Sequence, residues 1–231
     1  ILPFNDEEEK IYVANLAKAN KKLQELYDIE GSDKMQILKL LTRLRQLCLE
    51  PRLVYDNIDQ PSSKLKACME LIKTMQENKQ KVLLFSSFTS VLDLIAEECQ
   101  KAGITYYMLT GSTNKEDRRE LVSRFQKDDT TLFLISLKAG GTGLNLTSAE
   151  VVIHFDPWWN VSAQNQATDR AYRIGQKNNV QVFNLVMKDS VEEKIIELQK
   201  RKKELADMFV ENNSGGLSQM SKEDILSLFT M

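Results

Sequence analysis

Five short apolar segments that alternate with helical segments constrain the fold of this chain more than any other feature. The apolar segments are rich in β-branched and aromatic residues and occupy residues 81–86, 104–109, 131–136, 151–155 and 180–186. Segments with helical patterns follow them at 89–102, 114–127, 161–173 and 190–210. A repeated order of strand, helix and strand predicts a parallel sheet. Because the strands are almost continuously apolar, we expect helices on both faces and therefore an α/β domain of three layers.

Helical patterns also extend beyond this sheet. Apolar residues recur at helical spacing over 6–28 and 33–49, and Pro51 ends the second of these helices. Ser190 and Glu193 form a capping box for the last long helix. We therefore expect three parts, namely a helical extension, the α/β domain and a final helix with its tail, at residues 1–60, 61–188 and 189–231.

Composition excludes several classes of protein. The longest apolar runs, at 82–85 and 132–135, are far shorter than the ~20 residues that a membrane-spanning helix needs, so no membrane segment is expected. Cys48, Cys68 and Cys99 are odd in number and far apart, which argues against a disulfide framework and favours a reducing cytosol. The first ten residues are acidic and do not form a signal peptide, so we expect a piece cut from a longer protein.

The single histidine does not indicate a metal or acid/base site, and the net charge does not indicate a nucleic-acid-binding domain. His154 is the only histidine and lies within a predicted strand, where a core role is favoured over metal binding or acid/base catalysis. The net charge of −2 is unusual for a nucleic-acid-binding domain, so any DNA contact must be local.

A glycine-rich segment, SLKAGGTGLNL at 136–146, follows directly on a predicted strand, where parallel sheets place their ligand loops. A dinucleotide fingerprint would need glycine where the chain has Leu146. A phosphate-binding P-loop is also excluded, since none of the nine glycines is followed by lysine. Backbone amides freed by glycine beside Lys138 still favour an anion site over a plain turn.

The segment QNQATDRAYRIGQ at 164–176 carries Gln166, Arg170 and Arg173 at spacings that place all three on one face of a helix. The rigid guanidinium fork suits phosphate and carboxylate equally. From this segment alone, structural ion pairs with residues such as Asp169 and phosphate contacts remain equally open.

Two further segments lie at predicted strand ends. DPWWN at 156–160 follows the strand VVIHF, and one of its two tryptophans is expected in the core. Asp156 could act as a magnesium ligand, but no acidic partner follows it, so we predict no metal site. FSSFTS at 85–90 ends a strand in small hydroxyl residues at a helix start, where phosphates bind.

In this order, the segments closely resemble the carboxy-terminal helicase lobe of Swi/Snf-type DNA translocases, which belong to the second helicase superfamily. The resemblance covers essentially the whole chain and also runs through LRQLCLEPRL, SSKL, KVLLFSSFT and LTGST, at residues 44–53, 62–65, 81–89 and 109–113. It implies a RecA-like three-layer fold with a mostly parallel sheet. The flanking helices at both ends would brace this lobe against a missing amino-terminal RecA-like lobe of the same protein.

The resemblance also implies roles for single residues. Arg170 and Arg173 would be the arginine fingers that reach the γ-phosphate of ATP, which the missing first lobe would hold together with Mg²⁺. Further nucleotide contacts would come from Gln166, Gly143 and Asn145. Double-stranded DNA would be held at Ser87, Phe88, Thr89, Ser112, Thr113, Lys138, Gly141, Thr142 and Trp159. Val161 departs from the family pattern, in which proline commonly follows the WN pair.

We therefore expect the second motor lobe of a DNA-dependent ATPase, inactive as an isolated chain. A stand-alone nucleic-acid-binding module is the second hypothesis, and a dinucleotide-dependent enzyme is the third, demoted by its failed glycine spacing. An RNA helicase of another branch is disfavoured, because RAYRIGQ resembles the branch that tracks duplexes. The residue patterns of DPWWN and of the glycine segment indicate a bacterial source. We therefore expect the protein in the cytoplasm, or in the nucleus if the source is eukaryotic.

Overall fold

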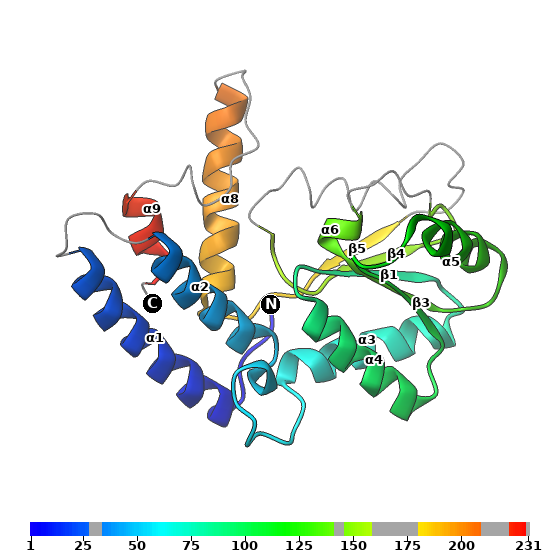
Figure 1. Ribbon diagram of the computed structural model, residues 1–231, viewed down its shortest axis with the longest axis horizontal. Helices are drawn as coiled ribbons and strands as arrows, with labels where there is room; N and C mark the ends of the chain where they lie inside the picture. The colour runs from blue at the N-terminus through cyan, green and yellow to red at the C-terminus, as the bar shows by residue number, and fades with distance from the viewer. Residues whose placement is uncertain (28–33, 141–145, 159–179, 209–221, 230–231) are drawn as a thin grey trace. The chain divides into compact units, whose positions relative to one another are not determined.

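The computed structural model describes residues 1–27, 34–140, 146–158, 180–208 and 222–229, which Figure 1 draws in colour. The chain divides into two compact units. One comprises Ile1–Leu65 together with Val186–Met231, and the other comprises Lys66–Leu185. Within the described residues, no helix is long and apolar enough to cross a membrane.

A five-stranded parallel sheet forms the centre of the second unit. Its strands are β1 (Val82–Ser86), β2 (Tyr106–Leu109), β3 (Leu132–Ser136), β4 (Val151–His154) and β5 (Gln181–Asn184). Their order across the sheet is β2-β3-β1-β4-β5, and each neighbouring pair is parallel. The predicted fold class, a three-layer α/β domain with a parallel sheet and flanking helices, is confirmed.

Helices lie on both sides of this sheet because its three central strands, β1, β3 and β4, are buried on both faces, whereas the edge strand β5 is mostly exposed. α4 (Thr89–Ala102) and α5 (Lys115–Lys127) lie on opposite sides in Figure 1. On the side of α5, Phe125 packs into a core that includes Leu83 and Phe85 of β1. All residues of β1 are buried, so neither face of this central strand meets water.

The residues at the end of β4 complete this core. His154 is 1% exposed, and its ring stacks on that of Phe85 with centroids 5.7 Å apart. Burial lowers the pKa of His154 to about 4, so the ring is neutral at pH 7. This is the core role expected for it. Trp158 also packs against the core, as predicted for one of the two tryptophans.

The first unit is helical. It contains α1 (Asp6–Tyr27), α2 (Lys34–Leu49), the short 3₁₀ helix η1 (Pro51–Leu53), α8 (Val191–Met208) and α9 (Lys222–Ser227). α2 packs against both α1 and α8. The three long helices lie where the sequence predicts them.

The start of α8 differs in detail from the predicted capping box. The hydroxyl of Ser190 accepts a hydrogen bond from the amide of Glu192 at 3.1 Å, as a cap should. Glu193, however, accepts from the amide of Asp189 at 2.7 Å, one residue before the expected Ser190. Asp189 has a left-handed backbone (φ 52°) and makes the turn into the helix.

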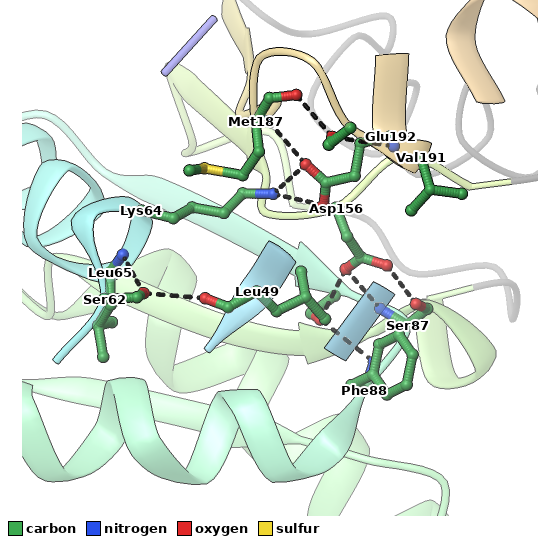
Figure 2. A network of polar contacts seen from close by, with 12 residues as sticks. Leu49, Ser62, Lys64, Leu65, Ser87, Phe88, Asp156, Met187, Val191 and Glu192 are labelled. Carbon is green, nitrogen blue, oxygen red and sulfur yellow. Dashed lines mark hydrogen bonds and ion pairs between the residues drawn. The ribbon is translucent and has the colours of Figure 1, made fainter. Parts of the chain in front are cut away.

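A buried ion pair joins the first turn of α3 (Ser63–Glu77) to that of α8. The ammonium of Lys64 donates to both carboxylate oxygens of Glu192, at 2.6 and 2.8 Å (Figure 2). The two side chains are 0% and 1% exposed. Glu192 also accepts a hydrogen bond from the amide of Met187 at 2.8 Å. Burial of both charges is tolerated because each is paired and hydrogen-bonded.

Candidate nucleic-acid interface

A hollow of about 580 Å³ opens at the carboxyl ends of the strands in the second unit. Three segments line it, because parallel strands bring the residues that follow them to one edge of the sheet. They are the start of α4, the turn after β2, and the end of β3 with α6 (Leu137–Gly140). The lining residues are Ser87, Thr89, Asp93, Met108, Thr110, Gly111, Ser112, Ser136 and Lys138.

Four of the DNA-binding residues expected from the sequence lie together in this hollow. They come from all three segments and are Ser87, Thr89, Ser112 and Lys138. Phe88 lies between two of them as the residue that precedes α4. Thr113 is not part of the lining. Its hydroxyl accepts from the amide of Thr110 at 3.1 Å and holds the turn after β2 in shape.

The remaining expected site residues lie outside the described residues. These are the DNA contacts Gly141, Thr142 and Trp159 and the nucleotide contacts Gly143, Asn145, Gln166, Arg170 and Arg173. Their roles therefore stay predictions.

The lining of the hollow is suited to an anion. Lys138 and Thr89 are exposed, and the hydroxyls of Thr110 and Ser112 lie 2.8 Å apart. Phe88, the N-cap residue of α4, has an extended conformation and supplies no side-chain cap. Helix amino ends favour anions because their first amides lack intrahelical partners. Hydroxyls, amides and one ammonium are the donors that bind phosphate without reading a base.

One wall of the hollow is held by a buried carboxylate. Asp156, 1% exposed, accepts a hydrogen bond from the hydroxyl of Ser86 at 2.7 Å. It also accepts from the amide of Ser87 at 3.0 Å (Figure 2). The hydroxyl of Ser87 also donates to it. The amide and hydroxyl of Ser87 are thus directed at Asp156, which makes Asp156 an organiser of this wall.

Sequence reasoning missed three contributors to this site. Asp93 lines the hollow one helical turn after Thr89, and the i, i+4 spacing was the available signal. The structural role of Asp156 had no local signal, because its partners lie 69 and 70 residues earlier in the chain. Arg118 donates to the carbonyl of Ala139 at 3.2 Å and so supports the start of the glycine segment.

A metal site is not evident in this part of the chain. Among the described residues, no group of three or more histidine, cysteine, aspartate or glutamate side chains could hold a metal ion.

Sequence comparison finds relatives along most of the chain. The family described as helicase conserved C-terminal domain matches residues 63–175. An uncharacterized ATP-dependent helicase of Mycoplasma pneumoniae is 38% identical over 90% of the chain and 20% of its own length. The putative ATP-dependent helicase/translocase YwqA of Bacillus subtilis is 37% identical over 86% of the chain and 22% of its own length. The chain thus spans about a fifth of the length of these relatives.

Solved structures of SWI2/SNF2 ATPases are also similar to this chain, along nearly its whole length. The C-terminal domain of a Sulfolobus solfataricus SWI2/SNF2 ATPase aligns with a TM-score of 0.77 at 26% identity, covering 98% of this chain and 94% of that one. The core of the Sulfolobus solfataricus SWI2/SNF2 ATPase in complex with double-stranded DNA aligns with a TM-score of 0.77 at 29% identity. That alignment covers 98% of this chain and 48% of the core.

Proposed function

Because the chain belongs to the helicase conserved C-terminal domain family, in its Swi/Snf branch, we propose that it is the second motor lobe of an ATP-driven translocase of double-stranded DNA. The observation that carries the proposal is the hollow at the carboxyl ends of the strands. It gathers Ser87, Thr89, Ser112 and Lys138 from three separate segments. The relatives support ATP use, since both bacterial ones are named ATP-dependent helicases.

In this proposal the hollow holds one DNA strand by its phosphates. Lys138 supplies the positive charge, and the hydroxyls of Thr89, Thr110 and Ser112 supply neutral donors. Such contacts fix the position of a duplex without depending on base sequence, which a motor that moves along DNA requires. The Sulfolobus solfataricus ATPase core was solved in complex with double-stranded DNA. By similarity, this supports a DNA duplex as the partner of this chain.

The ATP site is proposed to be shared with a preceding RecA-like lobe. Arg170 and Arg173 would contact the γ-phosphate from this lobe, and Gln166, Gly143 and Asn145 would help to place the nucleotide. Mg²⁺ would be held together with ATP mainly by the other lobe. Arg170 and Arg173 would supply the positive charge that stabilises the transferring phosphate, as arginine fingers do.

The proposed parts keep the boundaries expected from the sequence. Residues 61–188 form the motor lobe, and residues 1–60 and 189–231 brace it against the preceding lobe. The bacterial relatives support a bacterial source and, with it, a cytoplasmic location.

The DNA contact is tested by salt dependence. We expect Lys138→Ala to weaken duplex binding equally for unrelated base sequences and to reduce the slope of log K against log salt by about 1, because one phosphate contact is lost. Fluorescence anisotropy at several salt concentrations measures both quantities. Lys101→Ala is the matched control, since Lys101 is an exposed lysine in the last turn of α4, where it pairs with Glu98. Equal slopes for the two variants would exclude Lys138 from the DNA contact.

A further inference from the structure

Asp156 lies where two neighbouring strands end. β1 and β4 are adjacent and parallel, with Phe85 paired to His154. The pairing continues one residue further, since the amide of Phe155 donates to the carbonyl of Phe85 at 2.9 Å. Asp156 and the serines after Phe85 therefore meet at the carboxyl edge of the sheet.

The carboxylate of Asp156 directs the donors of the turn that leads from β1 into α4. Its Oδ1 accepts from the hydroxyl of Ser86 and the amide of Ser87, and its Oδ2 accepts from the hydroxyl of Ser87. The hydroxyl of Ser86 in turn accepts from the amide of Phe88 at 3.2 Å. An ionised carboxylate only accepts, so both serine hydroxyls must point their hydrogens at Asp156.

This arrangement has a consequence for α4. A serine hydroxyl near a helix start can accept from the amide two or three residues later, and for Ser87 these are the first amides of α4, those of Thr89 and Ser90. Here the hydroxyl of Ser87 is instead turned to Asp156, and Phe88, the N-cap residue of α4, supplies no side-chain cap. The first turn of α4, which begins at Thr89 on the wall of the hollow, is thereby left open toward that hollow.

We propose that Asp156 is a positioning residue for DNA binding, which holds the hydroxyl of Ser87 away from the first turn of α4 so that this wall can receive a DNA phosphate. The proposal rests on the proposed function, because it assigns a ligand to the same hollow. It adds a residue that does not touch the ligand and that acts through Ser87.

Whether DNA binding tightens or weakens distinguishes a positioning role from a simple effect of charge. A carboxylate near a phosphate repels it, so removal of a carboxylate should by charge alone tighten DNA binding. Asp93 supplies the matched comparison, since it is an exposed carboxylate that lines the same hollow. Asp93→Asn should therefore tighten binding, whereas Asp156→Asn should weaken it, although both substitutions remove one negative charge.

The experiment measures ATP hydrolysis by the whole protein as duplex DNA is added. We expect Asp156→Asn to raise the DNA concentration for half-maximal stimulation roughly tenfold, the equivalent of one hydrogen bond to a charged group. The maximal rate at saturating DNA should change much less. Asp93→Asn should lower the half-maximal concentration.

A double variant tests the mechanism itself. In Asp156→Asn the released hydroxyl of Ser87 can turn back and cap α4, so removing it in Asp156→Asn/Ser87→Ala should restore part of the lost DNA response. A structural role for Asp156 predicts the opposite, namely a further loss together with a lower melting temperature. The same direction of change in Asp156→Asn and Asp93→Asn would also overturn the proposal.

Lys138→Ala in the same assay distinguishes failure of the positioning role from failure of the proposed function. If Lys138→Ala weakens the DNA response and Asp156→Asn does not, the positioning role fails and the proposed DNA site survives. If Lys138→Ala has no effect or DNA does not stimulate the whole protein, the proposed function fails and the positioning role fails with it.

Discussion

Alanine at Arg170 or at Arg173 should lower kcat of the whole ATPase by a factor on the order of 10³ to 10⁵, the range attributed to arginine fingers. The reason is that, in the proposed site, a guanidinium at the γ-phosphate would stabilise charge that develops in the transition state, while ATP would be held mainly by the other lobe. Binding of ATP should change far less than kcat. Steady-state phosphate release and equilibrium nucleotide binding together measure this difference.

Arg119→Ala is the control for that experiment, because Arg119 is an exposed arginine on α5. It should leave kcat within about twofold of the unaltered protein, as surface substitutions away from a site generally cost little. A loss of several degrees in melting temperature with unchanged kcat at Arg170 or Arg173 would instead identify that arginine as a structural ion-pair partner.

Replacement of Lys64 by methionine should destabilise the chain by about 3 to 5 kcal/mol. The substitution leaves Glu192 without the ammonium that now lies 2.6 Å from it, in a place where the carboxylate is 1% exposed. A buried charge without a partner carries most of the desolvation cost and none of the attraction. Urea-induced unfolding at pH 7, followed by circular dichroism, measures the loss.

The double variant Lys64→Met/Glu192→Gln should recover most of this stability. Glutamine removes the unpaired charge and retains a carbonyl oxygen that can accept from the amide of Met187. Lys22→Met is the matched control, because the Lys22–Glu25 pair is about half exposed and such pairs contribute roughly 0 to 1 kcal/mol. Equal losses for Lys64→Met and Lys22→Met would show that burial of the pair is not important.

The fold could be predicted from the sequence because its signals are local. Four of the described strands, β1 to β4, are short and almost unbroken apolar runs, whereas β5 is half polar and mostly exposed. Asn114 and Gly103 mark the start of α5 and the end of α4. The order of the strands could not be predicted, because β1 lies between β3 and β4 only through crossovers that no local pattern specifies.

The site residues also divide into those that local sequence signals indicate and those that depend on the strand order. The DNA role of Ser87, Thr89, Ser112 and Lys138 is what the family resemblance implies. Their position at one edge of the sheet follows from the sequence, because each comes after a recognisable strand and parallel strands end at one edge. The role of Asp156 depends on β4 lying beside β1, which is a property of the strand order and not of the segment DPWWN. Lys64 gave no signal for a similar reason, since its partner Glu192 is 128 residues away.

ATP hydrolysis by this chain alone, compared with that of the whole protein, tests the shared ATP site most directly. Both are assayed for phosphate release at saturating ATP and duplex DNA. We predict no turnover above background for the chain alone, because the group that holds the β-phosphate and Mg²⁺ is proposed to lie in the other lobe. The whole protein should turn over ATP and lose that activity in Arg173→Ala. Turnover by the chain alone that disappears in Arg173→Ala would contradict a shared site.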